Sequence, residues 1–231
     1  MKISVIIPCF NEKNTAEKIL NKVIEQKKKF NIEIIVIDDF SNDGTIEILK
    51  KKFNEKIDIL MFNEKNFGKG YCIRKGLKFA TGQIILIQDA DLEYNPEEYK
   101  NLLNPFFIYD ADVVYGSRFK SSVENRVLYF WHSIGNKFLT FLSNLFTNLN
   151  LTDMETCYKI FKSEIIKSLV LKENRFGFEP EVTAKIAKKK DIKIFEVGIS
   201  YHGRTYDEGK KINWKDGFIA LFCIFKYNIL K

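Results

Sequence analysis

The first half of the chain alternates short apolar runs with stretches in which apolar residues recur at helical spacing. The expected strands are residues 3–7, 33–37, 57–62 and 84–87, and the expected helices between them are residues 15–30 and 70–80. Continuous apolar strands that alternate with helices are typical of a parallel sheet with both faces covered. We therefore predict an α/β fold whose twisted, mostly parallel sheet is flanked by helices.

The second half begins with a short expected strand at residues 113–115 and then changes character. Apolar positions at helical spacing predict long amphipathic helices over residues 128–149 and 214–230. The elements expected between them are a loop that enters a strand at 153–161, a helix at 179–189 and a last strand at 192–199. The chain has 231 residues, of which 45% are hydrophobic, and it shows no repeat or linker, so we expect a single domain.

Charge and cysteine content narrow the range of binding partners and of cellular compartments. The 37 basic and 30 acidic residues give a net charge of +7, which suits nucleotides, phospholipid surfaces or nucleic acid. The sequence shows no basic recognition helix, so nucleic acid is not expected. The four cysteines form no CxxC pair, which fits a reducing cytosol. No apolar run reaches the ~20 residues of a membrane-spanning helix, and the start does not resemble a signal peptide.

Acidic residues follow three of the expected strands. Asp38 and Asp39 come after the second strand, Asp89 and Asp91 come after the fourth, and Glu12 lies just beyond the first. In an open parallel sheet, ligands bind beyond the carboxyl ends of the strands, so we expect these side chains to meet in one site. Carboxylates gathered at one sheet edge repel each other unless a cation or hydrogen-bond donors lie among them.

Asp89 and Asp91 are separated by one residue, so both can face the same side of an extended strand end. In that position they can hold one Mg²⁺ or Mn²⁺ together with the oxygens of a diphosphate. Hard oxygen ligands favour these ions over zinc. An Asp-X-Asp sequence is also common in surface loops, so on its own it is weak evidence for a metal site.

Taken together, several segments resemble glycosyltransferase family 2, and within it the dolichol-phosphate mannose synthases and bacterial polyprenyl-phosphate glycosyltransferases. The matching segments are SVIIPCFNE (4–12), VIDDFSNDGT (36–45), NFGKG (66–70), QDADLEY (88–94), GSRF (116–119), TDMETCYK (152–159), RFGFE (175–179) and EGKKI (208–212). The resemblance implies one GT-A glycosyltransferase domain over residues 1–231 with C-terminal amphipathic helices. Residues 1–118 would form its nucleotide-sugar-binding half and residues 119–231 its acceptor-binding half.

The resemblance also implies sites for a nucleotide and for a metal ion, Mg²⁺ or Mn²⁺. The residues expected at the nucleotide are Pro8, Phe10, Glu12, Asp39, Lys69 and Asp89. The residues expected at the metal are Asp89, Asp91 and Glu93. Lys69 lies in a glycine turn that opens a helix, where backbone N–H groups can contact an anion, although a turn without phosphate contact is an equal alternative. The turn lacks the GxxxxGK[ST] spacing of an ATP-type phosphate loop.

Three arginines lie in segments that bind donor or acceptor phosphates in related enzymes. They are Arg118, Arg126 and Arg204. Guanidinium forks suit phosphate oxygens bidentately, so the resemblance implies an acceptor-phosphate role for all three. A solvated surface charge is the alternative for each, and the motif matches are stronger at Arg118 and Arg204 than at Arg126.

Asp153 and Glu155 lie where many inverting members of the family place a catalytic base. A sugar hydroxyl needs such a base. A lipid phosphate does not, because its second pKa near ~6 leaves it largely dianionic at neutral pH. Asp153 would then position the acceptor or cap a turn. The expected catalytic residues are Asp91, Arg118, Asp153 and Arg204.

The sequence thus predicts a metal-dependent, inverting transferase that moves a hexose from GDP-mannose or a UDP-sugar to a polyprenyl or dolichyl phosphate. The alternatives are transfer to a hydroxyl of a cell-surface glycan and a catalytically inactive nucleotide-sugar-binding protein. The two amphipathic helices are expected either to lie in a membrane interface or to pack against the sheet. The first option places the protein in the cytoplasm, on the inner face of the cytoplasmic membrane.

Four further residues are candidates for contact with the substrate. We expect His132 and His202 to be structural residues. Trp131 and Trp214 are expected to serve as packing or interface anchors and not as platforms on which a sugar stacks.

Overall fold

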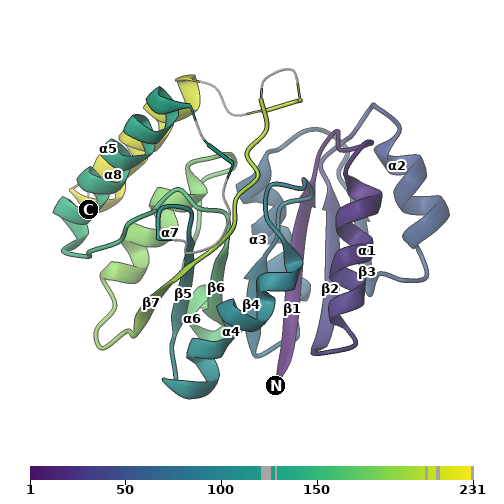
Figure 1. The fold of residues 1–231 in the computed structure, drawn as a ribbon, viewed down its shortest axis with the longest axis horizontal. Helices are drawn as coiled ribbons and strands as arrows, with labels where there is room; N and C mark the ends of the chain where they lie inside the picture. Colours follow the sequence, from purple (N-terminus) through teal and green to yellow (C-terminus); the bar gives the residue numbers. More distant parts are fainter. Residues whose placement is uncertain (121–125, 128, 206–207, 212–213, 230–231) are drawn as a thin grey trace.

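The structure is a computed structural model that describes residues 1–120, 126–127, 129–205, 208–211 and 214–229. These residues form a central seven-stranded sheet (Figure 1). Its strands are β1 (Lys2–Cys9), β2 (Asn31–Asp38), β3 (Ile59–Phe62), β4 (Ile84–Ile87), β5 (Val113–Ser117), β6 (Lys159–Lys162) and β7 (Ile194–Gly198). Their order is β3-β2-β1-β4-β6-β5-β7, and β6 runs antiparallel to both of its neighbours. The predicted mostly parallel sheet is confirmed.

Helices cover both faces of this sheet, with α1 and α4 in front of it and α3 and α6 behind it in Figure 1. The helices are α1 (Ala16–Gln26), α2 (Thr45–Ile48), the π-helical turn η1 (Leu49–Phe53), α3 (Lys69–Phe79), the 3₁₀ turn η2 (Pro96–Glu98), α4 (Tyr99–Ile108), α5 (Phe130–Thr147), α6 (Ser163–Lys167), α7 (Phe178–Ala187) and α8 (Trp214–Asn228). Strands β1, β2 and β4 are buried along most of their length, which explains why their sequences are continuously apolar and do not alternate.

The seven expected strands and all five expected helices are present, with bounds that shift by a few residues. Helix α1 is shorter than predicted, because residues 27–30 leave the helix in turns. The sequence pattern did not predict α2, η1, η2, α4 or α6. Helix α4 contains Pro105, whose missing N–H and bulky ring normally interrupt a helix. The predicted helix ends at residues 128 and 230 lie outside the described residues.

Helices α5 and α8 lie side by side at one end of the molecule, at the left of Figure 1, and both contact α7. The rings of Phe146 and Phe225 meet there, with their centroids 5.3 Å apart. Ala220, Cys223 and Ile224 form the buried stripe of α8. No helix in the described part of the chain is both long and apolar enough to cross a bilayer.

Candidate active site

A cleft of about 740 Å³ opens beyond the carboxyl ends of the strands. Most of the residues that the sequence nominated line it, namely Pro8, Phe10, Glu12, Asp39, Lys69, Asp89, Asp91, Glu93, Arg118 and Arg204. Two nominated residues, Asp153 and Arg126, do not line it. The parallel sheet therefore gathers the acidic strand ends into one site, as expected for this topology.

Asp39 follows β2 and fixes the glycine turn before α3. Its carboxylate accepts hydrogen bonds from the backbone N–H groups of Phe67 at 3.0 Å and Gly68 at 2.7 Å, and from the side chain of Asn63 at 2.8 Å. Both oxygens are therefore used within the protein. Contact of Asp39 with a base or ribose stays a prediction, and the structure adds a role in shaping the turn.

The turn depends on Gly68, and we expect Gly68→Ala to damage it. Gly68 has a φ of +102°, and a Cβ atom there would lie 2.5 Å from the carbonyl oxygen of Asn174. The substitution should destabilise the protein by roughly 1–3 kcal/mol and weaken nucleotide binding, because the turn carries Lys69. Urea unfolding and nucleotide titration would measure both effects. Gly135→Ala is the matched control, since Gly135 also lines the cleft and has open space around its Cβ position. Equal behaviour of the two variants would contradict this interpretation.

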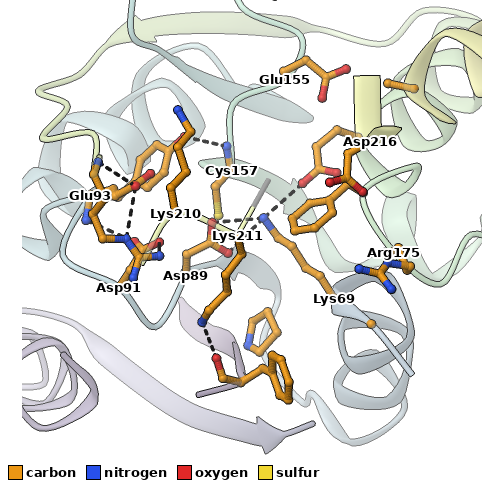
Figure 2. A pocket seen from close by; sticks show the side chains of 18 of the residues that line it. Lys69, Asp89, Asp91, Glu93, Glu155, Cys157, Arg175, Lys210, Lys211 and Asp216 are labelled. Carbon is orange, nitrogen blue, oxygen red and sulfur yellow. Dashed lines mark hydrogen bonds and ion pairs between the residues drawn. The ribbon is translucent and has the colours of Figure 1, made fainter. Parts of the chain in front are cut away.

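Lys69, at the start of α3, joins carboxylates on two sides of the cleft. Its Nζ lies 2.9 Å from Asp89 Oδ1 and 3.1 Å from Glu179 Oε1 (Figure 2). Burial alone would lower the pKa of Lys69, but the two carboxylates outweigh it and hold the pKa well above the ordinary value. The lysine therefore stays charged. It partly neutralises the acidic wall of the cleft, which is formed by Asp89, Asp91 and Glu93 just beyond the carboxyl end of β4.

Arg204 neutralises other carboxylates of the cleft, as Lys69 neutralises Asp89 and Glu179. It donates to Asp91 at 2.8 Å, to Glu12 at 3.2 and 3.3 Å, and to Glu93 at 3.3 Å. Tyr201 also donates to Glu93, at 2.7 Å. Burial and the nearby carboxylate of Glu93 raise the pKa of Asp91 well above its usual range, although Arg204 opposes this shift. A single guanidinium thus holds three carboxylates together.

The oxygen donors at this wall fit Mg²⁺ or Mn²⁺. Such ions are commonly held by one or two carboxylates together with substrate phosphates and water, and Asp89 and Asp91 supply that number. Among the described residues, no three His, Cys, Asp or Glu side chains are already arranged around a metal position. Asp89 is paired with Lys69 and Asp91 with Arg204, so a metal at this wall requires these cations to shift toward the diphosphate.

Arg118, which lines the cleft, forms a buried ion pair with Asp153, which does not. Arg118 Nε and Nη2 each lie 2.7 Å from a different oxygen of Asp153, and the Arg118 backbone N–H donates to the same carboxylate at 3.0 Å. Asp153 is fully buried. Its carboxylate raises the pKa of Arg118 against the opposing effect of burial. Because both Asp153 oxygens are occupied, this geometry fits the positioning alternative for Asp153 better than the base.

Arg126 lies apart from the cleft. It donates to the carbonyl oxygen of Gly203 at 3.0 Å and to Glu208 at 2.8 Å, and both charged side chains of the ion pair are about half exposed. All three nominated arginines therefore have carboxylate partners. These ion pairs could not be seen in the sequence around each arginine, because the carboxylate partners lie in distant segments of the chain.

Some residues of the cleft were missed by sequence reasoning. Tyr201 supports Glu93, and Lys211 contacts both Glu12 and the backbone carbonyl of Phe10. Glu179 binds Lys69. Lys211 and Glu179 lie in segments that match the family pattern, so that match was the available signal.

The sheet and the strand-end site define the class of this protein. The crystal structure of glucosyl-3-phosphoglycerate synthase from Mycobacterium tuberculosis with Mn²⁺, uridine diphosphate and phosphoglyceric acid superposes with a TM-score of 0.75. The match covers 100% of this chain and 79% of the synthase, at 16% identity. The same enzyme with Mg²⁺ and uridine diphosphate gives a TM-score of 0.71, over 98% of this chain and 79% of the synthase, at 16% identity. The fold is the GT-A fold of glycosyltransferases.

The sequence comparisons place the chain within that class. The profile described as Glycosyl transferase family 2 matches residues 4–170, and the chain belongs to this family. It is 30% identical to the uncharacterized protein MJ1222 of Methanocaldococcus jannaschii, over 99% of this chain and 93% of that protein. It is 27% identical to the dolichyl-phosphate beta-glucosyltransferase ALG5A of Trichomonas vaginalis, over 87% of this chain and 65% of that protein. The protein is therefore a family 2 glycosyltransferase.

Proposed function

We propose that the protein transfers a hexose from a nucleotide diphosphate to a polyprenyl phosphate, with inversion at the sugar carbon. The observation that favours a lipid phosphate as the acceptor is the apolar surface at the mouth of the cleft. Trp131 and Trp214 both line the cleft, and they are 79% and 71% exposed. A lipid phosphate can keep its prenyl chain at such a surface while its headgroup enters the cleft. A water-soluble acceptor has no use for this surface.

The two tryptophans belong to a larger exposed surface, which we call the α5–α8 face. Its members are Phe130, Trp131, Ile134, Phe138, Phe141 and Leu145 of α5, and Trp214, Phe218, Ile219, Phe222 and Phe225 of α8. Contiguous exposed apolar residues of this extent mark interaction surfaces, and Trp-rich amphipathic helices favour the membrane interface. The similarity to a dolichyl-phosphate glucosyltransferase supports the same acceptor. The proposal therefore places the protein on the inner face of the cytoplasmic membrane.

The reaction forms a bond between an acceptor phosphate oxygen and the anomeric carbon, and breaks the bond from that carbon to the nucleotide diphosphate. Asp89 and Asp91 would hold Mg²⁺ or Mn²⁺, which would supply charge neutralisation for the leaving diphosphate. The similar synthase structures contain Mn²⁺ or Mg²⁺ with uridine diphosphate. Arg118 and Arg204 would compensate the phosphate charges that approach each other. No base is needed, because the acceptor is already an anion.

Nucleotide release tests the proposed donor and acceptor together. The protein would be incubated with Mn²⁺ and separate UDP- and GDP-sugars, with polyprenyl phosphate, polyprenol or a glycan as acceptor. We expect rapid release of nucleotide diphosphate with one donor and polyprenyl phosphate, and only background release with polyprenol, which lacks the phosphate. Release that depends on the glycan and ignores the lipid phosphate would instead establish a hydroxyl acceptor.

The membrane contact makes a separate prediction. The double variant Phe138→Ser/Phe222→Ser removes one exposed ring from each helix of the α5–α8 face, and it should weaken binding to anionic vesicles without changing the fold. High salt or alkali should release the wild-type protein from membranes without detergent. Phe107→Ser is the matched control, because Phe107 is 58% exposed on α4, outside this face. Vesicle flotation would measure binding, and equal flotation of all three proteins would exclude the α5–α8 face as the membrane contact.

A further inference from the structure

Two carboxylates in the cleft have oxygens without the partners that buried polar atoms need. Glu155 Oε1 and Glu179 Oε2 are buried, and within the described residues neither has a hydrogen-bond partner. Both residues line the cleft, and Glu179 is only 4% exposed. Thr156 Oγ1, on the residue next to Glu155, is also buried and unpaired. Native proteins rarely leave buried polar atoms unsatisfied, so these positions call for a ligand that donates hydrogen bonds.

Helix α7 offers an internal comparison. Glu181 lies two residues after Glu179 and is fully buried, but its carboxylate accepts from the backbone N–H groups of Lys172 at 2.8 and 3.0 Å and Glu173 at 2.8 Å. A carboxylate with a structural role on this helix is therefore fully satisfied. Glu179, which lines the cleft, instead uses one oxygen for Lys69 and leaves the other buried and without a partner among the described residues.

The position of the two carboxylates relative to Asp89 indicates which part of a donor they meet. Lys69 links Glu179 to Asp89 through contacts of 3.1 and 2.9 Å, so Glu179 lies one side chain away from the wall proposed for the diphosphate. Figure 2 shows Glu155 and Lys211 on opposite sides of the pair formed by Lys69 and Asp89. Lys211 contacts the β1 end, where the nucleotide is expected. The sugar, which follows the diphosphate, then falls beside Glu155 and Glu179.

We propose that Glu155 and Glu179 recognise hydroxyl groups of the donor sugar, so that the cleft selects a neutral hexose whose hydroxyls facing these two residues are free. This inference rests on the proposed function, because it requires a nucleotide sugar in the cleft. A sugar O–H donates to each unpaired oxygen. The assignment differs from the sequence-based one, in which Glu155 was a candidate base.

The surroundings of Glu155 suit a hydroxyl. Burial, reinforced by the nearby Glu179, raises the pKa of Glu155 to about 8. A protonated carboxyl offers one donor and retains an acceptor, and a hydroxyl group can complement both. Lys159 does not satisfy Glu155, because its ammonium group donates to the carbonyl oxygens of Met154 and Thr156. A site built to bond a substrate hydroxyl rejects analogues that lack it more strongly than an apolar pocket does.

Donor analogues with one hydroxyl replaced by fluorine test this assignment, because fluorine keeps the size and removes the donor. Their affinities and that of the free nucleotide diphosphate would be measured by calorimetry with Mn²⁺ and no acceptor. For the wild-type protein, at least one analogue should bind about 10- to 100-fold more weakly than the parent sugar. In Glu155→Leu or Glu179→Leu, which retain no polar atom for the hydroxyl, that difference should largely disappear, and Glu155→Leu should leave the affinity for free nucleotide diphosphate unchanged.

Glu98→Leu is the matched control. Glu98 also has a buried, unpaired oxygen, but the residue does not line the cleft, so this variant should discriminate among the analogues as the wild type does. Thermal unfolding would verify that each variant is folded, and the two cleft variants provide independent readings. If no nucleotide sugar binds the wild type, the proposed function itself fails. If sugars bind but all analogues bind alike, or Glu155→Leu and Glu179→Leu leave the discrimination intact, the recognition role is wrong and the proposed function stands.

Discussion

Asp91→Asn is expected to lower the transfer rate by about 10³-fold while leaving the fold intact. A catalytic metal contributes several kcal/mol of charge stabilisation, and each ~1.4 kcal/mol is a factor of ten in rate. The structural cost should be small, because asparagine keeps the oxygen that accepts from the Glu93 N–H at 3.1 Å. It also removes one negative charge from a crowded acidic wall. Nucleotide release over a Mn²⁺ titration would measure the loss, and EDTA should reproduce it in the wild type.

Asp110→Asn is the control for this experiment. Asp110 is an exposed carboxylate that pairs with Lys162 and Lys193, away from the cleft, so its loss should leave activity unchanged. Full turnover in EDTA, or equal activity of Asp91→Asn and the wild type, would remove the metal from the proposed mechanism.

Asp153→Asn is expected to destabilise the protein by about 3–5 kcal/mol, because it leaves the buried charge of Arg118 without its partner. Urea unfolding would measure the change. The double variant Arg118→Met/Asp153→Leu should recover part of the loss, since it removes both charges together. Glu208→Gln breaks the exposed pair with Arg126 and should have little effect. Equal stability of Asp153→Asn and Glu208→Gln would show that the buried pair does not stabilise the fold.

The Arg118–Asp153 pair also changes how the acceptor can be tested by substitution. Comparing Asp153→Asn with Arg118→Ala would separate a base from a phosphate ligand only if the two side chains acted independently. They form one bidentate contact, so either substitution removes the same interaction. Arg204→Ala does not separate the two roles either, because its guanidinium also neutralises Glu12, Asp91 and Glu93 at the cleft wall.

Much of the fold was predictable because strands β1, β2 and β4 are buried on both faces, so their sequences are continuous apolar runs. The acidic ends of β2 and β4 could be placed together because parallel strands bring their carboxyl ends to one edge of the sheet. Helix α4 was missed because its sequence contains Pro105, which usually indicates a break. Local sequence patterns thus predicted the secondary structure correctly where burial determines the residue types. They failed where the tertiary structure tolerates a residue that is unfavourable in a helix.

The contacts within the site could not be predicted in this way. Arg204 reaches Glu12 across 192 positions and Asp91 across 113, and no local spacing encodes such pairs. The helical periodicity of α5 and α8 predicted amphipathic helices correctly. It could not show that only a narrow stripe of each is covered, because the width of the buried face depends on what α7 and the sheet place against it.

Identification of the chemical bond in the product tests the proposed function most directly. The protein would be incubated with Mn²⁺, the active labelled nucleotide sugar and polyprenyl phosphate, and the lipid fraction would then be exposed to mild acid. We predict that the label enters the lipid fraction and that mild acid releases it, because a glycosyl phosphate is acid-labile whereas an ordinary glycoside is stable. Label that stays out of the lipid and appears instead in an acid-stable glycoside of a hydroxyl acceptor would contradict transfer to a lipid phosphate.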